Sequence, residues 1–287
     1  LNHSLALYGF VEALYVGAEI ALLDHMRADR QIATLTDFET NLLYATPTQL
    51  RMLCRVAGSK TLPALGLILC GGGTLDETLR AHMAQVFPNA NTRIFYGASE
   101  TSFITLSDDQ MPSGSVGRPY PNVEIDIRNP QPDGIGELWV RSPYVFSGYA
   151  IGADRNTKIV DGFVTIGEMG WRDENGYVFL AGRKIRMLTV ADQNVFPEMV
   201  ETLIGQLAPH YDCAVVSLPD PLRGHILVAV LEGQQDDQIV KSLRAHLRSE
   251  LGPTRTPKMF IFVDTLPRTK SGKVNLITLT AQITEMI

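Results

Sequence analysis

The chain has 287 residues, of which 45% are hydrophobic and 20% are charged, so one large domain or two unequal domains with buried cores are expected. A formal net charge of -6, with no basic block, lacks the electrostatic footprint of a nucleic-acid-binding protein. The three cysteines form no CxxC pair, which argues against a disulfide framework or a zinc ribbon and favours a reducing compartment, the cytoplasm. They are Cys54, Cys70 and Cys213.

An apolar stretch at residues 5–23 is interrupted by Glu12 and Glu19. Two acidic side chains in so short a run favour a buried helix that leads into a strand over a helix that crosses a bilayer. We therefore expect no transmembrane segment in this sequence.

The next part of the sequence alternates helix and strand signals. Two capping boxes, Thr46–Gln49 and Thr74–Glu77, each predict the start of a helix, and the first has proline at the first helical position. The apolar run 65–70 is typical of a strand buried on both faces. This order of elements is typical of a parallel α/β sheet. The expected elements are a helix from the first box to Val56, strand 65–70, a helix from the second box to Val86, and strand 93–95.

From about residue 114 the pattern changes to short strands between turns, of which Asn175-Gly176 is the clearest, and this predicts an antiparallel β module. Near Arg186 an α+β unit of roughly 100 residues begins, long enough for its own core. We therefore predict an α/β protein with a large domain at 1–185 and a small domain at 186–287. The expected strands are 123–127, 137–141, 177–181, 213–218, 226–231 and 259–263; the expected helices are one from Pro197 to Ile204 and one with Ile239, Leu243 and Leu247 on one face.

Two clusters follow neighbouring strands and are therefore expected at one edge of the sheet. Gly71-Gly72-Gly73 lets backbone N–H groups approach an anion, and a tight turn without a ligand is the alternative. Tyr96-Gly97-Ala98-Ser99-Glu100 combines a ring for stacking with a hydroxyl and a carboxylate that suit Mg²⁺ and phosphate. A turn with a solvated Glu100 is the alternative there. A nucleophile elbow at Ser99 is disfavoured, because Thr101 replaces the last glycine of that motif.

A third cluster, Pro267–Lys273, is a basic segment near the end of the sequence. It is not a Walker phosphate loop, because Pro267 replaces the first glycine and Val274 follows the lysine. Two interpretations are open: a solvated charged loop, or a loop whose lysine neutralises phosphate charge in a transition state.

With Gly136–Pro143, Gly148-Tyr149 and Gly182-Arg183-Lys184, the three clusters form an ordered series along nearly the whole chain. This series resembles the adenylate-forming superfamily: acyl-CoA synthetases, adenylation domains of peptide synthetases, and luciferases. The resemblance implies a large N-terminal domain, here lacking its first part, and a small mobile C-terminal domain. It also implies an enzyme that joins a carboxylic acid to ATP, forms acyl-AMP, and passes the acyl group to a thiol, with Mg²⁺ and coenzyme A taking part.

The resemblance assigns a role to residues of every cluster. Lys273 would bridge the carboxylate and the α-phosphate, Ser99 would touch the α-phosphate, and Glu100 would hold Mg²⁺; these three are the expected catalytic residues. Arg186 would occupy the hinge about which the small domain rotates. The expected nucleotide-binding residues are Gly71, Gly72 and Gly73 beside the adenine, Tyr96 stacked on it with Gly97 next in the motif, Glu168 on the ribose hydroxyls, and Arg183 on the ribose and phosphate side.

The sequence departs from the family pattern in several places. Glu168 replaces an aspartate, Arg186 replaces the usual Asp or Lys, and Ala191-Asp192 replace two glycines of a loop near the incoming thiol. The family's Ser/Thr/Gly-rich phosphate loop is absent. We therefore expect an N-terminally truncated chain that is inactive by itself.

The predicted function is that of an AMP-forming carboxylate–CoA ligase that acts on a fatty or aromatic acid in the cytoplasm, with the acid and CoA, and no nucleic acid, as its partners. Two alternatives are open. The acceptor is instead the phosphopantetheine of a carrier protein, which a comparison of the two acceptors would decide. Or the chain is a non-catalytic scaffold, against which the joint presence of Glu100, Arg183 and Lys273 argues.

Overall fold

The computed structural model describes residues 4–23, 27–72, 75, 77–152, 156–191, 193–269 and 273–287. The chain divides into two compact units. The first comprises Leu1–Ile166 and Gly170–Leu180, and the second comprises Gly167–Met169 and Ala181–Ile287. The predicted domain boundary at 185/186 stays a prediction.

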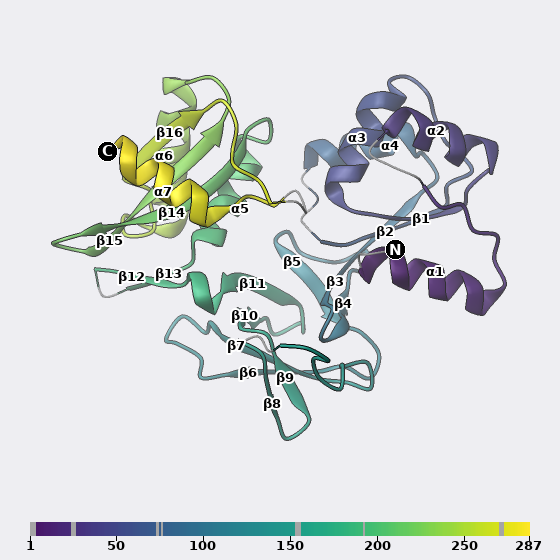
Figure 1. The fold of residues 1–287 in the computed structure, drawn as a ribbon, viewed down its shortest axis with the longest axis horizontal. Coiled ribbons are helices and arrows are strands. Elements are labelled where there is room, and N and C mark those ends of the chain that lie inside the picture. Colours follow the sequence, from purple (N-terminus) through teal and green to yellow (C-terminus); the bar gives the residue numbers. More distant parts are fainter. Residues whose placement is uncertain are drawn as a thin grey trace. The chain divides into compact units, whose positions relative to one another are not determined.

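The first unit opens with three parallel strands joined by helices. Its elements are α1 (Ser4–Val16), α2 (Ala28–Asp37), β1 (Leu42–Ala45), α3 (Pro47–Ala57), β2 (Leu67–Cys70), α4 (Glu77–Val86) and β3 (Asn91–Ala98). Ala45, Cys70 and Ile94 are partners across the three strands. Figure 1 shows α2, α3 and α4 together on one side of these strands and α1 on the other. The predicted parallel α/β sheet is thereby confirmed.

Helix α3 begins where its capping box predicts. The Thr46 Oγ1 accepts a hydrogen bond from the backbone N of Gln49 at 3.3 Å, and the Gln49 side chain accepts one from the backbone N of Thr46 at 2.9 Å. Pro47 lies at the first helical position, where a backbone N–H has no hydrogen-bond acceptor within the helix, so the N–H that proline lacks is not missed. Leu50 and Leu53 are fully buried, so the predicted apolar face packs into the core. The second capping box lies partly outside the described residues.

Helix α1 is not the buried helix that the sequence predicts, and the residues 17–23 after it form no strand. One face packs closely on β1: a Cβ added at Gly9 would lie 2.8 Å from the Tyr44 ring. Apart from Ser4 and Glu12 the helix is apolar on all sides, so burying one face leaves apolar side chains in solvent. The exposed ones are Leu7, Val11, Leu14, Tyr15 and Val16.

Antiparallel strands follow, as predicted: β4 (Ser102–Leu106), β5 (Ser115–Pro119), β6 (Glu124–Arg128), β7 (Gly136–Arg141), β8 (Lys158–Val160), β9 (Phe163–Thr165), β10 (Glu168–Arg172) and β11 (Val178–Arg183). Among the described residues they extend the sheet to eleven strands in the order β1-β2-β3-β4-β5-β11-β10-β7-β9-β8, with β6 paired to β7. The predicted Asn175-Gly176 turn joins β10 to β11. Gly176 has a φ of 85°, and the backbone N of Asp173 donates to the carbonyl of Tyr177 at 3.0 Å.

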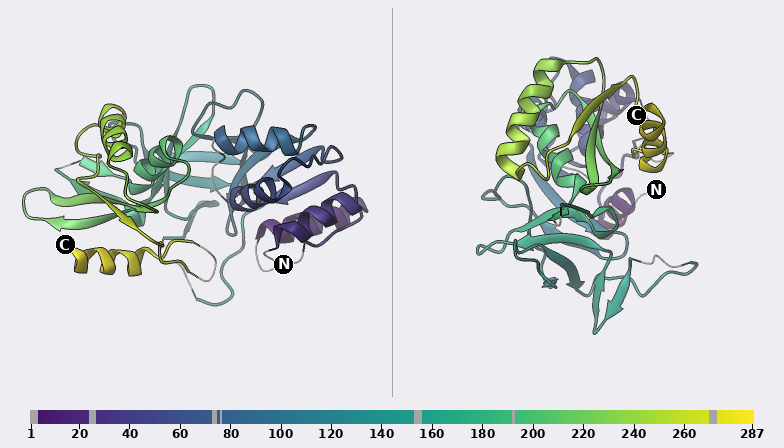
Figure 2. Two further views of the ribbon diagram at one scale, coloured as in Figure 1. Left: turned by 90° about the horizontal axis from the view of Figure 1, so that it is seen from above. Right: turned by 90° about the vertical axis from the view of Figure 1, so that its left-hand side faces the viewer.

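The second unit is built on three strands with a core on each face. Its elements are η1 (Lys184–Arg186), β12 (Leu188–Val190), β13 (Gln193–Val195), α5 (Pro197–Leu207), β14 (Asp212–Asp220), β15 (Gly224–Glu232), α6 (Asp237–Leu251), β16 (Met259–Val263) and α7 (Leu276–Met286). Leu243 and Leu247 of α6 pack with Val215 on one face, while Leu279 of α7 packs with Val216 on the other. Figure 2 shows α6 and α7 on opposite sides of this sheet.

The predicted mixed α/β class is confirmed, and boundaries differ by a few residues. Strand β2 begins at Leu67 rather than Leu65, and only one of its faces is fully buried, by Ile68 and Cys70. Among the residues that the structure describes, every helix is too short or too polar to cross a bilayer.

Candidate functional site

The fold itself explains why glycine occupies the first two positions after β2. A Cβ added at the buried Gly71 would lie 2.5 Å from the Phe95 ring, so any side chain here would have to displace that ring. Gly72 has a φ of 81°, a left-handed conformation that favours glycine. Gly73 lies outside the described residues. The backbone therefore turns sharply at the end of β2, as expected, and its role toward a nucleotide stays a prediction.

Tyr96 and Gly97 belong to strand β3 rather than to a loop after it, which corrects the predicted end of that strand. The strand continues to Ala98 because β4 pairs with it in an antiparallel hairpin, with an irregularity between Tyr96 and Gly97. A Cβ added at Gly97 would lie 1.9 Å from the carbonyl oxygen of Ser102. Glycine is therefore needed for the hairpin to close.

Ser99 and Glu100 lie in the tight turn of this hairpin, with Ser99 exposed and Glu100 half-buried. The Tyr149 hydroxyl donates to the Glu100 Oε1 at 2.7 Å and lies 3.0 Å from the Thr157 Oγ1. The backbone N of Phe146 donates to the Glu100 carbonyl at 2.9 Å. The segment that carries Tyr149 thus orients the candidate metal-binding carboxylate.

This arrangement fits Mg²⁺ shared with a substrate. Among the described residues there is no group of three or more metal-ligating side chains, so a resident metal held by protein alone is not supported there. Mg²⁺ is commonly held by one or two carboxylates together with phosphate oxygens. Tyr149 uses the Oε1 of Glu100, and the Oε2 has no partner among the described residues. A single oriented carboxylate of this kind suits a Mg²⁺–nucleotide complex.

In the second unit, Glu168 and Arg183 form an ion pair at the start of β10 and the end of β11. The Arg183 Nε donates to the Glu168 Oε1 at 3.1 Å. Glu168 is only 8% exposed. Burial raises the pKa of Glu168 above its usual value, and the nearby positive charges of Arg183 and Lys273 partly oppose that rise. Three predicted site residues therefore interact electrostatically within one unit.

Arg186 lies in η1 and is held by side chains of α5. Its Nη1 and Nη2 donate to the two carboxylate oxygens of Glu201 at 3.1 and 2.7 Å, and the Nη2 also donates to the Val215 carbonyl at 3.0 Å. Glu198 lies 3.4 Å from the Nη1. The side chain at the predicted hinge is thus anchored within the second unit, and its role as a pivot stays a prediction.

Lys273 is exposed and follows residues 270–272, which lie outside the described part. Its backbone carbonyl accepts a hydrogen bond from the backbone N of Thr269 at 2.8 Å. Its position is therefore fixed at the main chain.

Three contacts of the candidate site were not predicted from the sequence. Tyr149 was noted as part of a motif, but its partner Glu100 is 49 positions away in the sequence. The sequence gives no sign that Glu198 and Glu201 pair with Arg186, because these ion pairs join two different elements, α5 and η1.

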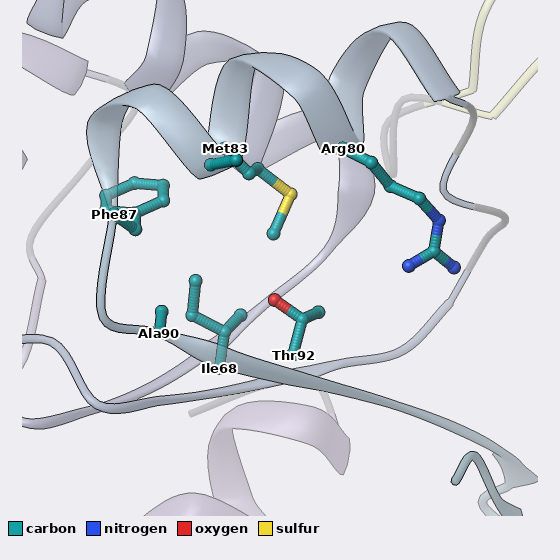
Figure 3. Close-up of a pocket in the computed structure, with 7 residues that line it drawn as sticks. Ile68, Arg80, Met83, Phe87, Ala90 and Thr92 are labelled. Carbon is teal, nitrogen blue, oxygen red and sulfur yellow. The ribbon is translucent and has the colours of Figure 1, made fainter. Parts of the chain in front are cut away.

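A separate cavity of about 220 Å³ lies between α4 and the strands β2 and β3 (Figure 3). Ile68, Met83 and Phe87 supply an apolar wall, and Arg80 and Thr92 supply polar groups. The other lining residues are Ala84 and Ala90. None of the predicted site residues lines this cavity.

The family model described as "AMP-binding enzyme" matches residues 1–150. The chain belongs to this family. The model of the AMP-binding enzyme C-terminal domain matches residues 199–273. The resemblance noted in the sequence is thereby confirmed, because both parts of an AMP-binding enzyme match in the expected order.

Relatives of this chain carry the names of CoA ligases. An uncharacterized acyl-CoA ligase of Bacillus subtilis is 33% identical over 276 residues, which cover 93% of this chain and 56% of the relative. A putative long chain fatty acid–CoA ligase of Staphylococcus haemolyticus is 33% identical over 276 residues, which cover 96% of this chain and 58% of the relative. The chain thus spans little more than half the length of these curated relatives.

A solved structure shows the same fold. The o-succinylbenzoate coenzyme A synthetase of Bacillus subtilis, in complex with ATP and magnesium ion, matches with a TM-score of 0.80 over 96% of this chain and 58% of that chain. The sequence identity is 21%, so this likeness concerns the fold.

Proposed function

We propose that this AMP-binding enzyme is an AMP-forming carboxylate–CoA ligase, which activates a fatty or aromatic acid as an acyl-adenylate and transfers the acyl group to CoA. The observation that carries the proposal is the ion pair of the buried Glu168 carboxylate with Arg183, at 3.1 Å, with the positive charge of Lys273 also acting on that carboxyl. Relatives named as CoA ligases support the acceptor. The free cysteines, Cys54, Cys70 and Cys213, suit a cytoplasmic location.

The second unit supplies groups for the ribose and for the reacting phosphate. Glu168 has two oxygens, of which Arg183 binds one, so the carboxylate can accept hydrogen bonds from ribose hydroxyls. When a carboxylate oxygen of the acid attacks the α-phosphorus, negative charge builds on the phosphate oxygens. In this proposal Lys273 stabilises that charge as a point cation aimed at the phosphate. Pyrophosphate then leaves, and the acyl-adenylate remains bound.

The first unit supplies groups for the adenine and the metal. In this proposal Tyr96 stacks on the adenine beside Gly71–Gly73 and Gly97, and Ser99 contacts the α-phosphate. Glu100, oriented by Tyr149, would hold Mg²⁺, which when bound would neutralise phosphate charge.

The test uses the protein as its gene encodes it. Acid-dependent exchange of pyrophosphate into ATP is measured over straight-chain and aromatic acids, and then CoA and a holo-carrier protein are compared as acceptors. The proposal expects exchange with at least one acid, and release of AMP with CoA. Exchange followed by transfer only to the carrier protein would show that the acceptor is the carrier protein and not CoA. Absence of exchange with every acid, while ATP still binds, would favour a non-catalytic scaffold. The 287 residues alone are expected to show no exchange.

A further inference from the structure

We propose that Arg268 is a positioning residue for Lys273 in the adenylation step, an inference that rests on the proposed function. Arg268 and Lys273 lie at opposite ends of the segment whose middle, 270–272, is outside the described residues. The residues on either side of that middle pair with each other. Arg268 and Val274 form an antiparallel bridge, and the backbone N of Asn275 donates to the Pro267 carbonyl at 2.7 Å.

The main chain of Lys273 belongs to the same short antiparallel pairing of residues 267–269 with residues 273–275, which we call the ladder. Its carbonyl accepts hydrogen bonds from the backbone N of Thr269 at 2.8 Å and from the Thr269 Oγ1 at 3.2 Å. The place of Lys273 is therefore set by where residues 267–269 are held. The lysine side chain itself is exposed, so its ammonium group can turn while its backbone stays fixed.

Arg268 fastens this ladder to the three-stranded sheet. Its Nη2 donates to the Asp212 Oδ2 at 2.6 Å and to the Glu232 Oε2 at 3.2 Å. The same Glu232 Oε2 accepts from the backbone N of Leu266 at 2.9 Å, which lies just before the ladder. One carboxylate therefore holds both the guanidinium and the main chain next to it.

The register of the sheet explains why a cation is needed at this place. Asp212 of β14 and Glu232 of β15 are direct partners across the antiparallel pair. Like charges at opposed positions repel each other, which destabilises the pair unless a cation lies between them. Arg268 is that cation. The attraction of the two acids for Arg268 thus selects one position for the ladder and for the backbone of Lys273.

The test compares the two half-reactions in the protein as encoded by its gene. A misplaced catalytic group costs roughly 10- to 100-fold in rate, so Arg268→Met is expected to lower the adenylation kcat by that factor with the KM for ATP unchanged. Thioester formation from supplied acyl-adenylate is expected to stay within about twofold, because Lys273 has no assigned part in it. Arg268→Lys keeps one charge and is expected to recover part of the rate. Arg244→Met, which removes another arginine of the second unit, is the matched control.

A double variant separates positioning from stability. Asp212→Asn with Arg268→Met removes the like-charge repulsion, so the melting temperature should recover while adenylation stays slow. Faster hydrogen exchange at the amides of Thr269 and Asn275 in Arg268→Met would support the loss of the ladder. Recovery of adenylation together with stability, or equal loss of both half-reactions, would overturn the inference. If Lys273→Ala abolishes adenylation and Arg268→Met leaves it unchanged, the inference alone fails; if Lys273→Ala also leaves it unchanged, the proposed role of Lys273 fails with it.

Discussion

Replacing Glu201 by alanine should strongly destabilise the second unit, because Glu201 is the main partner of the largely buried Arg186 guanidinium. Glu201 accepts hydrogen bonds from two nitrogens of Arg186 at 3.1 and 2.7 Å and from the backbone N of Val215 at 2.8 Å. Only 20% of the Arg186 side chain and 22% of the Glu201 side chain are exposed. Removing one partner of a buried ion pair costs about 3–5 kcal/mol, and because both side chains keep some exposure the expected loss is about 3 kcal/mol.

The free energy of unfolding is measured by urea denaturation for the wild type and three variants. Glu201→Gln keeps the shape of the side chain but loses its charge, so an intermediate loss of about 1–2 kcal/mol is expected. Glu250→Ala, at an exposed position of α6, is the control and should change the free energy by less than about 0.5 kcal/mol. A loss below about 1 kcal/mol for Glu201→Ala would refute the reasoning, since that is the range of a solvent-exposed pair.

Three further substitutions have expected outcomes. Burial raises the pKa of Glu168, and the charge of Arg183 partly opposes that rise. The Glu168 carboxyl therefore binds its proton more tightly in the folded protein than in the unfolded chain. As a result, the free energy of unfolding falls as the pH rises through the folded-state pKa. Glu168→Gln should therefore melt above the wild type at neutral pH, and the difference should shrink in acid; a constant difference would contradict this. Gly97→Ala brings a Cβ against the Ser102 carbonyl and should cost about 3 kcal/mol or more, and near-wild-type stability would count against the hairpin. Ala191 has a φ of 46°, so Ala191→Gly should raise the free energy of unfolding by about 1 kcal/mol; a lower melting temperature would argue against strain there.

Local sequence signals predicted the elements whose causes are local. The capping box at Thr46 and Gln49 fixed the start of α3 because both partners lie within one turn. The spacing of Leu243 and Leu247 predicted the buried face of α6, because helical geometry alone places these residues together. Elements that depend on distant partners were less well predicted. Strand β3 runs past Tyr96 because β4 pairs with it, and α1 packs one face on the sheet, through Gly9 on Tyr44 and Tyr8 on Phe103, while its other face stays exposed.

The candidate site shows the same division. The motifs carrying Glu100, Arg183 and Lys273 were visible in the sequence because their residues are contiguous. The contacts that orient Glu100 and anchor Arg186 were not visible, since Tyr149 and Glu201 come from other elements and ordinary polar side chains give no signal of their partners. A motif therefore names candidate residues, whereas the folded chain decides what holds each of them in place.

The most direct test of the proposed chemistry is the effect of Lys273→Ala on the two half-reactions in the protein as its gene encodes it. In the proposed mechanism Lys273 stabilises charge on the α-phosphate only while the acyl-adenylate forms, so its loss should lower acid-dependent pyrophosphate exchange by roughly 100-fold or more. Thioester formation from supplied acyl-adenylate and CoA should stay close to the wild-type rate. Equal loss of both half-reactions, or unchanged exchange, would contradict the role of Lys273.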